Sequence, residues 1–403
     1  MNSSYKFKRI FVIVADSVGI GEEPDAADFG DVGSHTLRHA AESVGGLKVP
    51  NMEAMGLGEL SNIPGVTPNR DHPHAYCLTL RETSRGKDTM TGHWEMMGIN
   101  TQKPFQTFTD TGFPKELIDE LEKRTGHACI GNYSSSGTEI LVKLGEEQMR
   151  DNSLIVYTSA DSVLQIAAHE EVTGVQELYR CCEIARELCM RPEWKVGRVI
   201  ARPYIGTNKD NFKRVGGDRH DYALSPEEST AMDVLKANGF ETSCVGKISD
   251  IFNGAGVTRT VHTVSNEDGM DKTIDQLKNF DFTGMCFVNL VEFDSEFGHR
   301  RNPVGYARAL EAFDKRVGEF LSFMKEDDLL MITADHGNDP IFKGTDHTRE
   351  RVPLLLYSPA FKKGRKLEEQ DTFGAIGATV LENFHLRKPK HLLGKPLAAI
   401  FEE

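Results

Sequence analysis

Three short segments of the chain combine aspartate and histidine in a pattern that suits metal binding. They are VADSVG with Asp16, VEFDSEFGHRR with Asp294 and His299, and TADHGNDPIFKGTDHTRERVP with Asp335, His336 and His347. Hard divalent cations prefer carboxylate oxygens, and imidazole nitrogens can complete such a site. Six ligands are enough for two ions with three protein ligands each. Two ions close together can stabilise both the attacking and the leaving oxygen of a phosphoryl transfer.

Each segment also has a simpler interpretation. Asp16 alone could be a turn residue or a helix cap. His299 could lie on a solvated face, and the Asp335–His336 pair before a glycine could form an ordinary turn. For these simpler interpretations to hold, ligand-type residues would have to occur by chance at the ends of three separate strand-like runs. The polar segment GTDHTRE would also have to precede the strand-like run VPLLLYS by chance. The sequence therefore favours a two-metal site.

The stretch RGKDTMTGHWEM, residues 85–96, is the second candidate for chemistry. A neutral hydroxyl is a weak nucleophile unless a base or a metal activates it. Thr89 opens a predicted helix, TMTGHWEMMG, whose first amide groups could face a phosphate. Thr89 could equally be the cap of that helix. The residues alone leave the choice open between a nucleophile and a cap.

The elements that must position these residues follow an α/β pattern. The apolar runs RIFVIV, MCFVNLV (285–291) and DLLMIT (328–333) are typical of strands buried on both faces of a parallel sheet. Helical spacing marks 305–326 and 225–239, and Ser225 with Glu228 resembles a capping box at the start of the latter. This alternation predicts a central, mostly parallel sheet flanked by helices, with the active site at the carboxyl ends of the strands.

The middle of the chain has its own pattern. Two strand-like runs, beginning at 153 and 196, enclose the helical stretch VQELYRCCEIARELCM. We therefore expect an inserted α+β cap domain over 104–225. The core domain is then made of 1–103 and 226–403.

Composition excludes several classes of function. The net charge of −14 disfavours a general nucleic-acid or membrane-surface binder. The seven cysteines form no CxxC pair, and the apolar run near the N-terminus is too short to span a membrane, so we expect a cytoplasmic protein. Nucleotide-binding glycine motifs are missing from the sequence. Oligomeric state cannot be predicted.

The metal-binding motifs resemble those of the alkaline phosphatase superfamily. TADHGND, the later GTDHTRE and the DxxxxGH of Asp294 to His299 carry this resemblance. The phosphopentomutase family is the closer match, because GKDTMTGHWEMMG resembles its nucleophile loop. TSADSVLQIAAHEE, IARPY and RHDYAL resemble its cap, and GKISDIF resembles a further core segment. The likeness covers nearly the whole chain.

This resemblance implies an alkaline-phosphatase-like core with an inserted cap, and two Mn²⁺ ions. One ion would be bound by Asp16, Asp335 and His336, and the other by Asp294, His299 and His347. Thr89 would be the phosphorylated nucleophile. Substrate-binding candidates, mainly from the resemblance, are Asp161, Arg202, Arg219 and Lys247.

The implied reaction interconverts ribose 1-phosphate, or deoxyribose 1-phosphate, with the 5-phosphate through a pentose 1,5-bisphosphate. A bisphosphorylated sugar would prime the threonine. The alternatives are a metal-dependent phosphatase or phosphodiesterase of the same superfamily, a cofactor-independent phosphoglycerate mutase, and a non-catalytic metal-binding scaffold. Thr89 and the cap motifs speak against the second alternative, and the complete ligand set speaks against the third.

Overall fold

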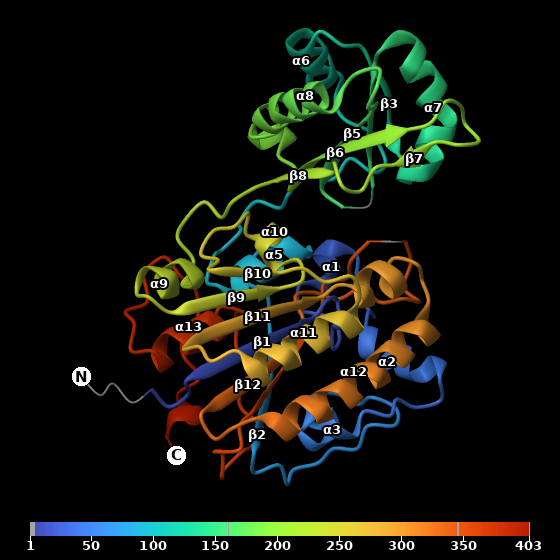
Figure 1. Cartoon of the computed structure of the whole chain (residues 1–403). Helices are drawn as coiled ribbons and strands as arrows, with labels where there is room; N and C mark the ends of the chain where they lie inside the picture. Colours follow the sequence, from blue (N-terminus) through green and yellow to red (C-terminus); the bar gives the residue numbers. More distant parts are fainter. Residues whose placement is uncertain (1–4, 160, 345, 403) are drawn as a thin grey trace. The chain divides into compact units, whose positions relative to one another are not determined.

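The computed structural model describes residues 5–159, 161–344 and 346–402. The chain divides into two compact units (Figure 1). Unit 1 contains residues up to Lys103 and from Ser225 onward, and unit 2 contains Pro104–Leu224. The predicted insertion covers 104–225.

Unit 1 is built on a seven-stranded sheet (Figure 1). Its strands, in sheet order, are β10 (Arg259–Val261), β9 (Glu241–Val245), β11 (Gly284–Leu290), β1 (Arg9–Ala15), β12 (Asp328–Thr333), β13 (Val352–Tyr357) and β2 (Ala75–Leu80). The first five are parallel, whereas β13 is antiparallel to both of its neighbours. Every residue of β1, β11 and β12 is buried, as expected for strands covered on both faces.

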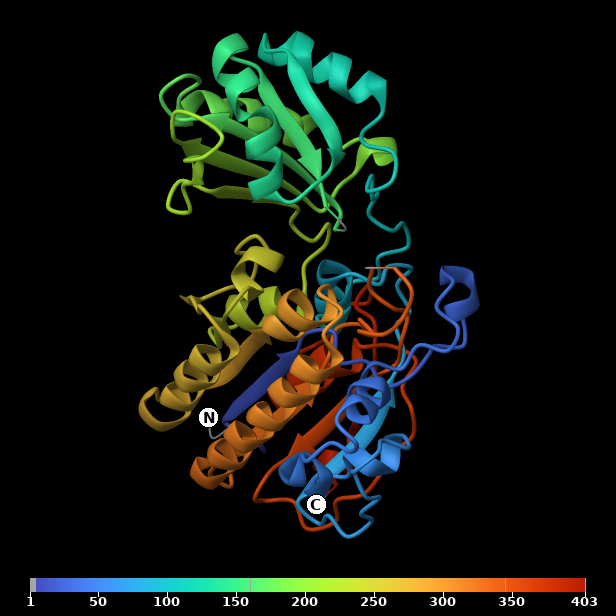
Figure 2. The same ribbon diagram turned by 90° about the vertical axis from the view of Figure 1, so that its right-hand side faces the viewer.

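Helices cover both faces of this sheet (Figures 1 and 2). One group contains α2 (Thr36–Ser43), α3 (Pro50–Ala54), α11 (Asn266–Asn279) and α12 (Pro303–Phe323). The other contains α5 (Thr89–Met96), α9 (Ala231–Ala237), α10 (Ile248–Ile251) and α13 (Ala375–Asn383). Short helical turns complete unit 1: α1 (Ala26–Phe29), α4 (Leu57–Leu60), η2 (Phe293–Gly298) and η3 (Ala398–Phe401). The α/β core with a mostly parallel sheet is confirmed.

The predicted start of one helix is wrong. Helix α9 begins at Ala231, not at Ser225. Thr230 is its N-cap, and a complete capping box joins Thr230 to Asp233. The expected pair, Ser225 and Glu228, and the observed pair, Thr230 and Asp233, both have an acidic residue three positions after a hydroxyl. Only tertiary packing distinguishes the two pairs.

Unit 2 has a six-stranded mixed sheet. Its strands are β3 (Cys129–Ser134), β4 (Leu154–Thr158), β5 (Val163–His169), β6 (Arg198–Ile205), β7 (Lys213–Arg214) and β8 (His220–Ala223). Its helices are α6 (Lys115–Thr125), α7 (Gly137–Asp151), α8 (Val175–Leu188) and the turn η1 (Pro192–Trp194).

Two separate cores lie on opposite faces of the sheet in unit 2. Leu154 and Val156 of β4 pack with α6 and α8, whereas Ile155 and Tyr157 pack with α7. This division follows from the strand period of two, which points successive side chains to opposite faces. Unit 2 therefore has a hydrophobic core of its own.

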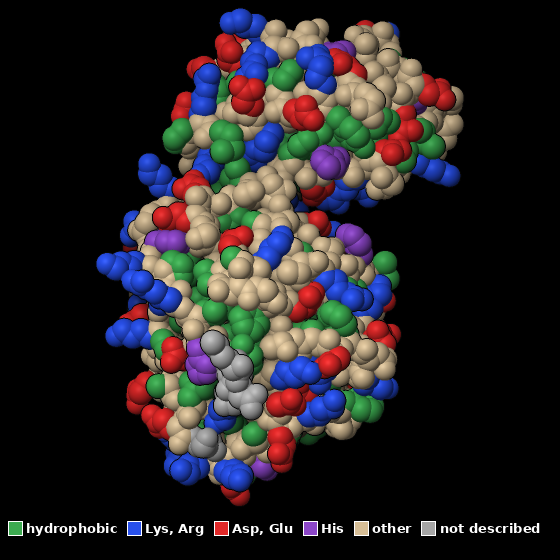
Figure 3. Space-filling model, turned by 60° about the vertical axis from the view of Figure 1, so that its left-hand side comes forward, with side chains coloured by type: hydrophobic (Ala, Val, Ile, Leu, Met, Phe, Trp, Pro, Cys, Tyr) green, Lys and Arg blue, Asp and Glu red, His purple; other side chains and the backbone are tan. Residues whose placement is uncertain are grey.

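Charged side chains are mixed on the surface. Figure 3 shows one face on which Lys and Arg alternate with Asp and Glu instead of gathering in one basic patch.

Each of the seven cysteines is a free thiol. Within the described residues, no helix combines the length and the apolar character that a membrane crossing requires.

Candidate metal centre and nucleophile

The predicted metal ligands of unit 1 follow three neighbouring strands. Strands β11, β1 and β12 are adjacent and parallel, so their carboxyl ends lie at one edge of the sheet. Asp16 follows β1, Asp294 lies in the turn η2 after β11, and Asp335 and His336 follow β12. The turn η2 is a π-helical turn, a feature that is frequent at functional sites. The sheet topology thus brings ligands together that are more than 300 residues apart.

Asp16, Asp335 and His336 form the first ligand group. His336 Nε2 lies 3.5 Å from Asp16 Oδ1 and 3.4 Å from Asp335 Oδ2. His336 Nδ1 donates to the carbonyl oxygen of Gly337 at 3.0 Å. That bond leaves Nε2 as the ring nitrogen with a lone pair, directed at the two carboxylates.

Asp294, His299 and His347 form the second ligand group. Nε2 of His299 lies 3.1 Å from Asp294 Oδ2, and Nε2 of His347 lies 3.4 Å from Asp294 Oδ1. The two imidazole Nε2 atoms are 3.1 Å apart. The rings of His336 and His347 have centroids 4.1 Å apart, so the two groups are neighbours.

The charges of the two groups fit divalent cations. Among the described residues, Asp16 Oδ1 and Asp335 Oδ2 are buried oxygens that accept no hydrogen bond. Burial raises the pKa of Asp16 well above its ordinary value, and the Asp335 and Asp294 carboxylates raise it further. Cations at this point would compensate the buried negative charges and satisfy the two oxygens. The carboxylate and imidazole donors suit such ions.

Three neighbouring groups orient the carboxylates. The Asn289 side-chain amide donates to Asp16 Oδ2 at 2.8 Å, and the Asn338 amide donates to Asp294 Oδ1 at 2.7 Å. The backbone N–H of Ser17, a residue with a φ of 69°, donates to Asp335 Oδ1 at 2.9 Å. A left-handed non-glycine residue is uncommon and is typical of functional sites. Sequence reasoning missed these residues, although Ser17 and Asn338 lie within two positions of a predicted ligand.

Thr89 is placed beside the first ligand group. Its Oγ1 lies 3.2 Å from His336 Nε2. The N-cap of α5 is Asp88, whose carboxylate accepts from the Thr91 N–H at 3.0 Å. The interpretation of Thr89 as the cap is therefore wrong. Thr89 is the first residue of the helix, where unpaired amide groups and the helix dipole favour a phosphate.

His93 ties helix α5 to the ligands. Its Nδ1 donates to the Thr89 carbonyl oxygen at 2.8 Å and lies 3.2 Å from Asp335 Oδ2. Its Nε2 accepts from the Asn289 amide at 3.2 Å. One imidazole thus contacts the backbone of Thr89, a member of the first ligand group and the asparagine that orients Asp16.

Gly92 allows helix α5 to pack directly on the ligand loop, and its replacement tests that contact. A Cβ at this position would overlap the Asp335 carbonyl oxygen. We expect Gly92→Ala to displace Thr89 and to lower activity about 100-fold, the usual effect of an ångström-scale misplacement. Gly216→Ala is the control, because nothing lies within 4 Å of its Cβ. Steady-state kinetics compares the two; equal activities would show that α5 does not need this close contact.

Arg349 connects two loops, of which one carries His347 and the other precedes Thr89. The guanidinium is buried and donates to the carbonyl oxygens of Glu82, Ser84 and Gly86. It also pairs with the Glu82 carboxylate at 2.8 Å. One side chain therefore fixes both loops, because several bonds in different directions allow it a single orientation.

Three of the predicted substrate-binding residues line one cavity in unit 2. The cavity has a volume of about 270 Å³, and Asp161, Arg202 and Arg219 line it. Arg202 Nε donates to Gln165 Oε1 at 3.0 Å, while Arg219 makes two 2.7 Å bonds to Asp221. Burial lowers the pKa of Arg202, and the nearby Arg219 lowers it further. Two crowded guanidinium groups in a cavity favour an anionic ligand.

The start of helix α7 adds to this cavity. Ser136, the N-cap, and Gly137 line its wall, and the helix is 15 residues long. The positive end of the helix dipole therefore contributes to the same anion-favouring environment. The fourth candidate, Lys247, belongs to unit 1, where it is exposed and pairs with Asp250 at 3.6 Å.

The chain is similar to a family of metalloenzymes and to curated proteins that share one name. The family model described as Metalloenzyme superfamily matches residues 8–388. The phosphopentomutase of Clostridium beijerinckii is 58% identical over 97% of this chain and 98% of its own length. The phosphopentomutases of Clostridium botulinum and Clostridium tetani are 57% and 56% identical over the same shares.

Proposed function

The chain belongs to the phosphopentomutase family of the metalloenzyme superfamily, and on this premise we propose that it interconverts pentose 1-phosphates and pentose 5-phosphates through a phosphorylated Thr89. The substrates are ribose 1-phosphate or deoxyribose 1-phosphate and the corresponding 5-phosphates. The observation that carries the proposal is the 3.2 Å approach of Thr89 Oγ1 to the ligand His336. No other hydroxyl of the loop combines such a position with the first turn of a helix.

The reaction consists of two phosphoryl transfers. In the first, the C5 hydroxyl of the 1-phosphate attacks the phosphorus on Thr89. The bond from phosphorus to Thr89 Oγ1 breaks, the hydroxyl proton passes to the threonine oxygen, and a pentose 1,5-bisphosphate forms. In the second, Thr89 Oγ1 attacks the phosphorus at C1, and the C1 oxygen leaves with a proton. Thr89 is phosphorylated again, and the product is the 5-phosphate.

The ligand groups support this chemistry in two ways. Two divalent cations, which we propose to be Mn²⁺, would lower the pKa of the Thr89 hydroxyl and neutralise charge on the transferred phosphate. Asp16, Asp335 and His336 would bind one ion, and Asp294, His299 and His347 the other. The amide groups at the start of α5 stabilise the phosphate on Thr89 through the helix dipole.

We propose that the cavity of unit 2 binds the sugar and the phosphate group that is not being transferred. Arg202 and Arg219 supply planar groups that can bind phosphate through two bonds each. Asp161 can accept hydrogen bonds from sugar hydroxyls. Lys247 is kept as a further phosphate-binding candidate, and its contact with Asp250 is exposed and weak.

A bisphosphorylated sugar would be needed as an activator. The second transfer regenerates phosphothreonine only if the bisphosphate stays bound, so each loss of the intermediate leaves Thr89 unphosphorylated. A sugar bisphosphate added from solution would restore it. We propose that the reaction takes place in the cytoplasm, which agrees with seven free thiols.

One assay separates the mutase from its nearest alternative. Ribose 1-phosphate, Mn²⁺ and a catalytic amount of a sugar bisphosphate should yield ribose 5-phosphate with little inorganic phosphate. A metal-dependent phosphatase would release inorganic phosphate at the rate of substrate loss. Bound metal without turnover of any phosphate ester would instead support a non-catalytic scaffold.

Arg202 provides a test of the cavity in unit 2. We expect Arg202→Ala to raise KM for ribose 1-phosphate by about 10- to 100-fold, the equivalent of one charge-assisted contact. Metal content should not change, because Arg202 lies in unit 2 and the ligands lie in unit 1. Arg124→Ala is the matched control, since Arg124 pairs with Glu187 on the surface of the same unit. Unchanged kinetics in Arg202→Ala would remove this residue from the site.

A further inference from the structure

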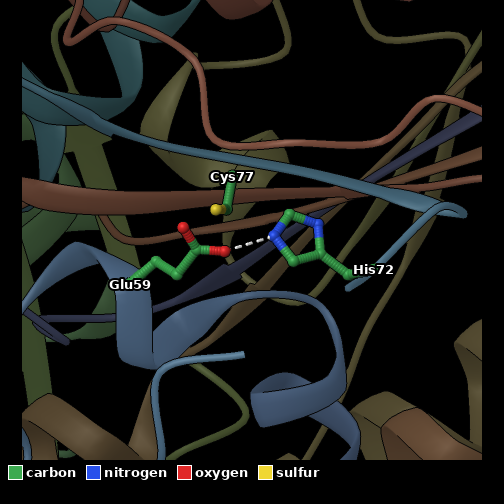
Figure 4. A group of neighbouring side chains, drawn as sticks. All are labelled: Glu59, His72 and Cys77. Carbon is green, nitrogen blue, oxygen red and sulfur yellow. Dashed lines mark hydrogen bonds and ion pairs between the residues drawn. The ribbon is translucent and has the colours of Figure 1, made fainter. Parts of the chain in front are cut away.

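A second cluster of metal-ligand side chains lies in unit 1, formed by Glu59, His72 and Cys77 (Figure 4). Glu59 belongs to the short helix α4, His72 to the following loop, and Cys77 to the strand β2. Their ligand atoms all lie within 4.8 Å of one another. Figure 4 shows the carboxylate, the imidazole and the thiol directed toward a common point. His72 and Cys77 are buried.

The hydrogen bonds of His72 require a positive charge or a proton at this point. Nδ1 lies 2.8 Å from the carbonyl oxygen of Ala75, which can only accept, so Nδ1 carries a proton. In a neutral imidazole, Nε2 then presents a lone pair. Nε2 lies 2.6 Å from the Glu59 carboxylate, which is also an acceptor when ionised. A proton or a metal ion must separate these two acceptors. The carbonyl bond at Nδ1 is also the arrangement that usually orients a metal-binding histidine.

The backbone leaves space beside the sulfur and the imidazole. Gly56 has a φ of +94°, and a Cβ there would lie 2.7 Å from Cys77 Sγ and 2.9 Å from His72 Nε2. A residue with a side chain would therefore fill the cluster. Burial and the Glu59 carboxylate together raise the pKa of the Cys77 thiol to about 12, so the sulfur is protonated unless a cation binds it.

We propose that Glu59, His72 and Cys77 form a three-ligand site for a thiolate-binding divalent cation, of which Zn²⁺ is the best match. Zn²⁺ accepts sulfur, nitrogen and oxygen ligands together, whereas Mn²⁺ and Mg²⁺ prefer oxygen. Binding releases the proton at Nε2 of His72 and the thiol proton of Cys77. Two positive charges enter and two leave, so the buried cluster keeps its net charge. The Glu59–His72 hydrogen bond opens to admit the ion.

This site is separate from the candidate catalytic centre. Strand β2 runs parallel to β12, because both are antiparallel to β13. Cys77 lies in the amino-terminal half of β2, and His72 precedes that strand. Asp335 and His336 instead follow the carboxyl end of β12. The proposal therefore does not depend on the reaction assigned to Thr89.

Cobalt provides a probe that distinguishes a thiolate site from the candidate catalytic centre. Co²⁺ bound to a thiolate gives a near-ultraviolet sulfur-to-metal charge-transfer band, and the six catalytic ligand candidates include no sulfur. We expect Co²⁺ added to the full-length protein to produce this band and excess Zn²⁺ to remove it. Cys77→Ser should abolish the band.

Two cysteine variants serve as matched controls. Cys244→Ser changes a buried cysteine of strand β9, and Cys181→Ser changes one that lies near His127 and Glu177. Both should keep the band. Absence of the band in the unmodified protein, or its persistence in Cys77→Ser, would overturn the proposal. Loss of the band in Cys181→Ser alone would do the same.

A second variant keeps the test decisive if Cys77→Ser does not fold. Glu59→Gln alters the most exposed of the three ligands, and it should weaken Co²⁺ binding at least about tenfold while leaving the band detectable. Zn²⁺ should also raise the thermal unfolding midpoint of the Mn²⁺-loaded protein, and less so in Glu59→Gln. Equal Co²⁺ affinity in the variant and the unmodified protein would exclude Glu59 as a ligand and contradict the site as proposed.

Discussion

Thr89→Ala is expected to lower the kcat of the mutase about 10⁴-fold or more, while the metal content of the protein stays unchanged. The reason is that, in the proposed reaction, this hydroxyl accepts and donates the phosphate in every cycle. None of the six metal-ligand candidates is changed by the substitution. The measurement combines the ribose 1-phosphate assay with metal analysis of the purified protein.

The phosphorylation state gives an independent readout of the same variant. Intact-mass and peptide mapping should show a phosphate on Thr89 in the unmodified protein after incubation with a sugar bisphosphate, and none in Thr89→Ala. Thr89→Ser is the matched control, since it keeps a hydroxyl at the first position of α5 and should retain both phosphorylation and measurable activity. Full activity of Thr89→Ala, or a phosphate on Thr91 instead, would refute the assignment.

The meeting of the strand-end ligand candidates could be predicted, because an apolar run and a following aspartate coincide at each strand end. Asp16 and Asp335 each follow a continuous apolar run, and such runs form parallel strands whose carboxyl ends share an edge of the sheet. The fold class follows from the same signals. The N-cap of helix α5 is harder to predict from the sequence. Asp88 and Thr89 are both good capping residues, and only the backbone conformation distinguishes them.

The residues that orient the ligands could not be predicted from the sequence. Asn289 lies inside the apolar run of β11, where a polar residue carries no local sign of its partner. Its contact with Asp16 depends on the register of β1 with β11, in which Ala15 is paired with Leu290. Arg349 is a similar case, because its bonds to three carbonyl oxygens exist only after two distant loops meet. Contacts of this kind depend on tertiary structure and leave no periodic pattern.

Asp16→Asn is expected to change stability and activity in opposite directions. In the metal-free protein, burial and the Asp335 and Asp294 carboxylates make ionised Asp16 unfavourable. The amide removes that charge and keeps an oxygen that can accept from Asn289, and its N–H₂ group can donate to His336 Nε2, now 3.5 Å from Asp16 Oδ1. We expect the metal-free variant to be more stable by about 2 kcal/mol. Mutase activity with metal should fall by at least about 100-fold, because a proposed metal ligand loses its charge.

The pH dependence of the free energy of unfolding provides a second test of the buried Asp16 charge. The folded, metal-free protein binds a proton at Asp16 at pH values where the unfolded chain, with a pKa of about 3.9, has already released it. The unfolded state then binds fewer protons, so the free energy of unfolding falls as pH rises above about 4. Asp16→Asn should lack this contribution. Denaturant unfolding of metal-free protein at several pH values measures it.

Asp328→Asn is the control that fixes the interpretation of Asp16→Asn. Asp328 is also a fully buried carboxylate of the core, but two bonds of 2.7 and 2.9 Å pair it with Arg9. Its neutralisation leaves the guanidinium uncompensated, so we expect a destabilisation of about 3–5 kcal/mol. The same substitution is thus expected to lower stability where arginine is the partner of the carboxylate, and to raise it where the proposed partner is a metal ion. If Asp16→Asn destabilised the metal-free protein as Asp328→Asn does, the protein would already compensate the Asp16 charge, and the argument for a cation there would fail.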